Sequence, residues 1–218
     1  GEMLPLSVHA YDEKGRLIGP VDAQWSLNGL QGQVAGGLFM PSKVGQGGWV
    51  VAKVGDLTGQ TWVRAVPDVP WTEDFENVAM GKNPTHWVWG GRGFKVEEKD
   101  GSKVLAKPPA ARGLDRSSLY VGPPEMKGYT IQTDLIGTKN RRRLPDLGLV
   151  ANRYLLDMQG IHQRLEVRSW SSDLRMRKYV DFKWDVDVWY TMKMKVDIED
   201  GKAIVRGKVW KRDEAEPD

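Results

Sequence analysis

Side chains that could bind a polar ligand alternate with apolar ones along residues 164–170. At this period-two spacing Leu165 and Val167 share one face of a strand, and the other face carries charged groups and an indole. Those groups belong to Arg164, Glu166, Arg168 and Trp170. An indole stacks on the apolar face of a sugar ring, while guanidinium and carboxylate groups hydrogen-bond its hydroxyls. The pattern suits a sugar, and it also suits a solvated sheet face stabilised by Arg–Glu pairs.

Further hydrogen-bonding side chains lie just upstream, among residues 154–162. Asp157 and Glu166 are the best pair of acids for glycoside hydrolysis, which needs two carboxylates held at a defined separation. The sequence sets no distance between them, and acidic pairs arise by chance, so we predict no catalytic residue. The predicted ligand-binding residues are Tyr154, Asp157, Gln159, Arg164, Glu166, Arg168 and Trp170.

Three other groups of residues could carry chemistry. The basic run at 141–143 could bind an acidic glycan, a phosphate or a membrane surface, or it could be a solvated loop tip. The three histidines lie far apart without metal-ligand spacing, so we predict no metal site. Tryptophans divide into two sets by their neighbours. We expect a core position for Trp25, Trp49 and Trp62, and exposure for Trp87, Trp89, Trp170 and Trp184.

The composition of the chain limits the classes of function that it can have. The 218 residues suffice for one large β domain or two modest ones. The net charge of +3, from 32 basic and 29 acidic residues, is small for a nucleic-acid binder, so we expect no such partner. Cysteine is absent, and no apolar run reaches membrane-spanning length. No signal peptide opens the chain, and strand-like sequence reaches both ends, so we expect a fragment of a longer polypeptide.

Strand patterns extend along the whole chain, and no helical period of useful length competes with them. Residues 3–66 form short strands between glycine-rich turns. The prolines in 67–70 favour a short, stiff linker. Beyond it, a hairpin is expected around residues 99–102, and 190–198 alternate strongly. In that last strand we expect an inward face made of Tyr190, Met192, Met194, Val196 and Ile198.

Two runs in the first part, VHAYDEKGRLIGPVDAQWSL and GGLFMPSKVGQGGWVVAKVGDLTGQTWVRAV, resemble bacterial Ig-like domains of the invasin type. The shared features are a D-x-x-G turn before an x-W-S strand, then a G-x-F strand and a V-x-A-x-x-G ending. The resemblance implies that Trp25 and Phe39 are core residues and that Gly37 and Gly55 are turn residues. Domains of this family are more often spacers or adhesive stalks than catalysts.

The second part resembles concanavalin A-like jelly rolls, a superfamily that takes in laminin-G-like lectin domains and 3-keto-disaccharide hydrolase-like domains. The motif order D-F-E, F-x-V, Y-T-I-Q-T-D, G-L-V, Y-L-L-D-M-Q, W-Y-T-M-K-M-K-V and V-R-G-K-V-W carries this resemblance. The whole chain resembles the C-terminal region of large secreted planctomycete-type proteins in which a PQQ-binding-like β-propeller precedes these domains. That implies an extracytoplasmic setting: periplasmic, secreted or cell-surface.

These observations predict an all-β chain of two tandem antiparallel β-sandwiches. We assign residues 1–67 to an Ig-like domain, 68–70 to a linker and 71–218 to a jelly roll whose closing strands would follow Asp218. The expected function is a non-catalytic carbohydrate-binding or adhesive accessory module, without a cofactor, whose partners are a glycan or polysaccharide and the remainder of its parent chain. Two alternatives remain. The domains could only pack on the propeller, or they could form a glycoside-active enzyme of the keto-disaccharide hydrolase type.

Overall fold

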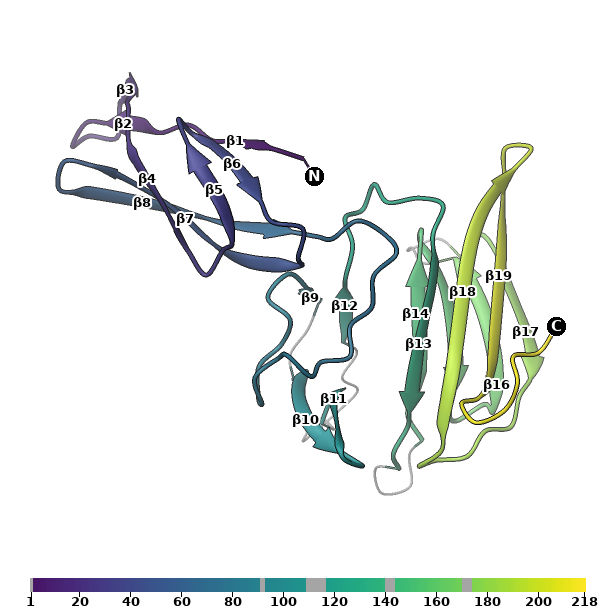
Figure 1. The fold of residues 1–218 in the computed structure, drawn as a ribbon. Coiled ribbons are helices and arrows are strands. Elements are labelled where there is room, and N and C mark those ends of the chain that lie inside the picture. The colour runs from purple at the N-terminus through teal and green to yellow at the C-terminus, as the bar shows by residue number, and fades with distance from the viewer. Residues whose placement is uncertain (1, 91–92, 109–116, 140–143, 170–173) are drawn as a thin grey trace. The chain divides into compact units, whose positions relative to one another are not determined.

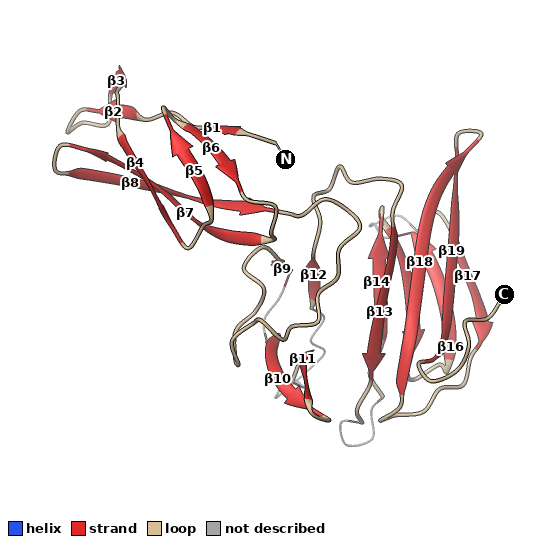
Figure 2. Ribbon diagram, viewed as in Figure 1, coloured by secondary structure: helices blue, strands red, loops and turns tan. Residues whose placement is uncertain are grey.

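The computed structural model describes residues 2–90, 93–108, 117–139, 144–169 and 174–218. In these ranges the regular structure consists of antiparallel strands without a helix, and so without a helix that could cross a membrane (Figure 2). This confirms the predicted all-β sandwich class. The chain divides into two units, Gly1–Pro123 and Pro124–Asp218. Residues 68–70 lie inside the first unit, and the predicted domain limits stay a prediction.

The first unit begins with two small sheets packed around an apolar core (Figure 1). One sheet has the strand order β1 (Leu4–Pro5), β6 (Leu38–Pro41), β5 (Gly32–Ala35). The other has the strand order β4 (Gln24–Asn28), β7 (Gln46–Val54), β8 (Leu57–Ala65). A separate pair joins β2 (His9–Tyr11) to β3 (Leu17–Pro20). Phe39, Val50 and Val63 are buried between the sheets, and Trp25 packs against them. The predicted core positions of Trp25 and Phe39 are confirmed.

The expected core positions of Trp49 and Trp62 are wrong, because both side chains lie outside the core and that of Trp62 is 48% exposed. Trp49 and Trp62 are direct cross-strand partners, and their rings meet edge to face at 5.2 Å. Their neighbours Val50 and Val63 point into the core, so strand alternation places both indoles on the opposite face of the sheet. The two tryptophans therefore stabilise the outer face of this sheet as a cross-strand pair.

The rest of the first unit contains two short antiparallel ladders. They pair β9 (Val88–Gly90) with β12 (Ser118–Tyr120), and β10 (Lys95–Lys99) with β11 (Ser102–Ala106). The second ladder is the hairpin predicted around 99–102. Asp100 and Gly101 form its two-residue turn with φ angles of 53° and 81°. Positive φ at both central residues is the geometry that Asp-Gly favours in hairpins.

The segment around His86 packs onto the start of β7. The Gly47 N–H donates to Thr85 Oγ1 at 2.9 Å, and a Cβ on Gly45 would lie 2.6 Å from His86 Nε2. The His86 side chain is buried, and its Nε2 accepts a hydrogen bond from Trp87 Nε1 at 3.1 Å. Burial lowers the pKa of His86, and the Arg64 guanidinium adds to this effect. The packing therefore favours the neutral imidazole.

We expect the first unit to lose stability as the pH falls below about 6.5, the ordinary pKa of histidine. In the unfolded chain His86 binds a proton near that pH, whereas in the folded unit it does so only at lower pH. The free energy of unfolding should therefore fall through this window and level off below the native pKa. Urea unfolding between pH 7.5 and pH 5, followed by NMR signals of the first unit, measures this.

His86→Gln, whose amide oxygen can still accept from Trp87, should remove most of this pH dependence. His9→Gln, at an exposed position, is the matched control and should keep the slope of the wild type. An equal slope in wild type and His86→Gln would show that another group is responsible.

The second unit is a sandwich of two sheets (Figure 1). One has the order β13 (Thr130–Ile136), β18 (Trp189–Glu199), β19 (Lys202–Lys211), and the other has the order β14 (Leu147–Ala151), β15 (Tyr154–Gln159), β16 (Arg164–Ser169), β17 (Arg177–Asp181). Leu156 and Met158 of one sheet share a core with Met192 and Met194 of the other. A Cβ on Gly207 would lie 2.7 Å from Leu156 Cδ2, so glycine allows this close approach.

Two expectations about this core are wrong. Ile198 follows the inward alternation of β18 but is 74% exposed, because it lies next to the Asp200-Gly201 hairpin turn, beyond the buried part of the strand. Trp184, expected to be exposed, is only 4% exposed and belongs to the core. Its Nε1 donates to the Gln159 carbonyl oxygen at 3.1 Å, and its ring meets Tyr190 edge to face. The connection from β17 to β18 thus places this indole inside the sandwich.

Candidate functional site

The polar side chains of β15, β16 and β17 share the face of their sheet that points away from the core. Leu165 and Val167 pack against the core, as the alternation predicted. The cross-strand register puts Asp157 opposite Glu166 and Glu166 opposite Tyr179. By strand alternation, the polar face comprises Asp157, Gln159, Arg164, Glu166, Arg168, Arg177, Tyr179 and Asp181.

Glu166 is the centre of the polar face. Its side chain is 2% exposed, and Oε2 accepts hydrogen bonds from Arg177 Nε at 3.0 Å and lies 2.8 Å from Arg164 Nη2. Arg168 Nε lies 3.4 Å from the other oxygen, Oε1. A buried carboxylate needs such partners, because burying it alone would cost several kcal/mol. The arginines of β16 and β17 therefore cover this carboxylate and neutralise it.

Asp157 extends the network toward β15. Gln159 Nε2 donates to Asp157 Oδ2 at 3.2 Å, and Gln159 Oε1 accepts from Arg164 Nε at 2.8 Å. Arg168 Nη2 lies 3.9 Å from Asp157 Oδ2. Burial raises the pKa of Asp157, with smaller contributions in the same direction from Asp146 and Glu166, while the Gln159 bond and Arg168 oppose the shift. Asp157 thus takes up a proton more readily than an ordinary aspartate.

One group of the polar face remains open to a ligand. Tyr179 is 58% exposed, and the Arg164 guanidinium lies 4.6 Å from the centre of its ring. Such a contact holds an aromatic ring in place. Arg168 Nε is buried and has no hydrogen-bond partner among the described residues, its geometry to Glu166 being too poor for one. The exposed ring is suited to stacking on a sugar, whereas the Arg168 Nε–H is enclosed by the protein.

The structure brings together Asp157, Gln159, Arg164, Glu166 and Arg168 on the polar face. Tyr154 lies on the other face, where it packs against the core. The sequence already indicated this placement. Tyr154 and Asp157 are an odd number of residues apart, and such residues on one strand point to opposite faces of the sheet. Trp170 and the basic run 141–143 lie outside the described residues.

Sequence reasoning missed Arg177 and Tyr179. The signal was the alternation of Arg177, Tyr179 and Asp181 with Lys178 and Val180, which is typical of a strand. Their placement beside Glu166 and Arg168 depends on the pairing of β17 with β16.

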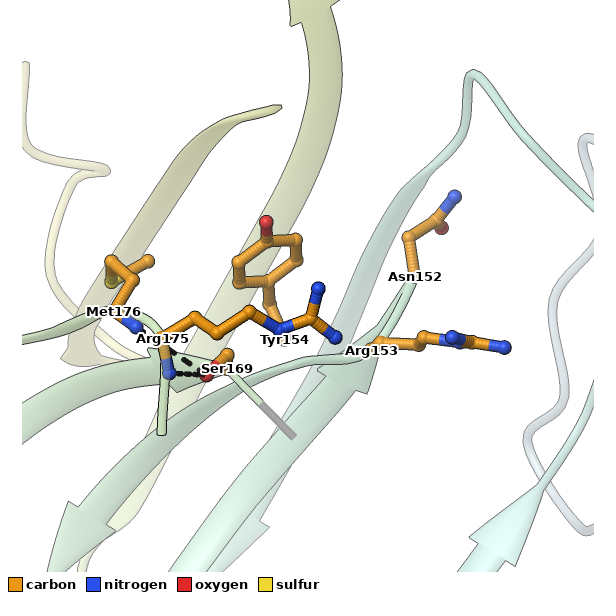
Figure 3. Close-up of a pocket in the computed structure, with 6 residues that line it drawn as sticks. All are labelled: Asn152, Arg153, Tyr154, Ser169, Arg175 and Met176. Carbon is orange, nitrogen blue, oxygen red and sulfur yellow. Dashed lines mark hydrogen bonds between the residues drawn. The ribbon is translucent and has the colours of Figure 1, made fainter. Parts of the chain in front are cut away.

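A pocket of about 180 Å³ lies at one end of the same sheet (Figure 3). This end pocket is lined by Asn152, Arg153, Tyr154, Ser169, Arg175 and Met176. Figure 3 shows the Arg175 side chain running beneath the Tyr154 ring, toward the turn that carries Arg153. Ser169 Oγ accepts hydrogen bonds from the N–H groups of Arg175 and Met176, at 2.9 and 3.4 Å. These bonds fix the backbone that carries Arg175.

The described part of the chain holds no group of three or more histidine, aspartate or glutamate side chains placed to bind a metal ion. Comparison with known proteins gave no match to a family model, to a curated protein or to a solved structure.

Proposed function

We propose that this chain is a non-catalytic carbohydrate-binding module and that the polar face binds the sugar. The exposed Tyr179 ring, held in place by the Arg164 guanidinium, is the observation that carries the proposal.

The burial of both carboxylates supports a non-catalytic role. A general acid or nucleophile must reach the glycosidic bond, whereas Glu166 is 2% exposed and Asp157 is 7% exposed. Oε2 of Glu166 is also engaged by both Arg164 and Arg177. These contacts give the glycoside-active alternative less support than the binding module.

We also propose that the two units belong to a larger extracytoplasmic protein. The order of motifs in the sequence, which resembles an Ig-like domain followed by a concanavalin A-like jelly roll, supports this assignment. Accessory modules of such proteins position their parent on a glycan. The competing proposal is that the units only pack against a PQQ-like propeller. It is favoured by the extent to which the arginines around Glu166 are already paired within the chain.

Tyr179→Ala should weaken glycan binding about tenfold, since losing an aromatic contact of about 1.5 kcal/mol changes a dissociation constant by that factor. The measurement is binding of the 218-residue chain to a broad glycan array, followed by titration of the best ligand. Tyr11→Ala is the matched control, because Tyr11 is an exposed tyrosine of the first unit, at 61% exposure. Tyr11→Ala should bind like the wild type.

Two outcomes would count against the proposal. If a folded wild-type chain binds no glycan on the array, the purely structural role becomes the better account. If a glycan binds and Tyr179→Ala has no effect, the sugar is held elsewhere and the polar face is a structural network.

A further inference from the structure

We infer that the end pocket binds the carboxylate of an acidic sugar, so that the preferred ligand is a glycan with uronate residues. This inference rests on the proposed carbohydrate-binding function and adds a second site to it. The end pocket is distinct from the polar face: Tyr154 and Ser169 point to the opposite side of the sheet from Arg168 and Glu166.

The charges of the end pocket favour an anion. Arg153 and Arg175 line it, and among the residues that the structure describes no aspartate or glutamate does. Both arginine side chains are exposed, and neither forms an ion pair with a carboxylate of the described residues. This contrasts with the polar face, where Arg164 and Arg177 are engaged by Glu166. A guanidinium with open N–H groups binds a carboxylate through two parallel hydrogen bonds.

The backbone of the turn gives independent support. Asn152 and Arg153 form the two-residue turn between β14 and β15, with φ angles of 46° and 68°. The corresponding second residue is Gly101 in the β10–β11 hairpin and Gly201 in the β18–β19 hairpin. A left-handed conformation costs a side chain such as arginine about 1–2 kcal/mol, a cost that glycine avoids. Arg153 therefore occupies a left-handed position that glycine takes in these two hairpins, and the turn presents its guanidinium at the pocket.

The remaining lining residues suit a sugar ring. Tyr154 contributes a half-buried aromatic ring, with the Arg175 side chain below it in the view of Figure 3. Asn152 donates its amide N–H to the Met126 carbonyl oxygen at 3.5 Å, which leaves its side-chain oxygen to accept from a hydroxyl. The volume of about 180 Å³ is below the ordinary range of ligand pockets, so it accommodates one residue of a chain rather than a whole oligosaccharide.

The test is an NMR titration of the ¹⁵N-labelled full chain with trigalacturonate, with its methyl ester, and with sodium sulfate. The ester keeps the sugar rings and removes the charges, and sulfate supplies an anion without a sugar. We expect trigalacturonate to shift the amide signals of residues 152–154 and 175–176, and the ester to shift them at least about tenfold more weakly.

Arg175→Gln should weaken trigalacturonate binding about tenfold or more, and Arg16→Gln, which removes one exposed arginine from the first unit, should not change it. Arg153→Gly should weaken binding while raising the unfolding midpoint of the second unit, since it relieves the left-handed arginine. A variant that binds weakly because it is partly unfolded would show a lower unfolding midpoint. Weaker binding together with a higher midpoint therefore separates a lost contact from lost stability.

Equal shifts from the acid and its ester, or binding that Arg175→Gln leaves unchanged, would overturn the inference. Shifts with sulfate and none with trigalacturonate would mean an adventitious ion site only. If neutral glycans shift the β15–β17 signals and nothing shifts the end pocket, the inference fails and the proposed function stands. If no glycan shifts either site, both fail.

Discussion

Replacing Glu166 with glutamine should destabilise the second unit by about 3–5 kcal/mol, because removing one partner of a buried ion pair leaves the other charge uncompensated. Glu166 is 2% exposed and lies within 2.8–3.4 Å of guanidinium nitrogens from Arg164, Arg168 and Arg177. Glutamine keeps the shape of the side chain and removes its charge. The arginines would then repel one another across β16 and β17.

The measurement is urea unfolding followed by NMR signals of the second unit, because two units need not unfold in one transition. The matched control is Glu199→Gln. Glu199 pairs with Arg206 at 2.9 Å, but its side chain is 53% exposed, so we expect a loss below about 1 kcal/mol. Similar losses in the two variants would mean that water solvates the Glu166 carboxylate and that the polar face does not depend on it.

Trp184→Ala should destabilise the second unit by about 3–5 kcal/mol, the usual cost of replacing a core tryptophan with alanine. The change removes a side chain that is 4% exposed and packs on Tyr190, and it also removes the donor to the Gln159 carbonyl oxygen. Gln159 bridges Asp157 and Arg164, so loosening the end of β15 should also weaken the polar network. Urea unfolding of the second unit measures the first effect.

Trp184→Phe separates the two contributions. Phenylalanine keeps much of the packing and loses the N–H, so the variant should lose about 1–3 kcal/mol for the unpaired Gln159 carbonyl and the smaller ring. A loss in Trp184→Ala no larger than about 1 kcal/mol would contradict the buried position of this indole.

Patterns among residues close together in the chain account for much of what the sequence predicted correctly. Alternation along residues 164–169 separated the core face, with Leu165 and Val167, from the polar face. The Asp-Gly pair at 100–101 marked a hairpin turn, because only a few residues tolerate positive φ at low cost. These features depend on neighbours along the chain, so one sequence suffices to find them.

The tertiary structure alone decided features that depend on contacts between distant residues. Alternation put Glu166 on the polar face, but its burial depends on Arg177, which the pairing of β17 with β16 brings alongside. Trp184 has polar neighbours in the sequence, yet its connection folds the indole into the core. Trp62 occupies a strand and still lies outside the core, since the face that a sheet buries is chosen by the sheet packed against it. The end pocket likewise exists because the β14–β15 turn lies near Arg175 and Met176, and no local pattern specifies that proximity.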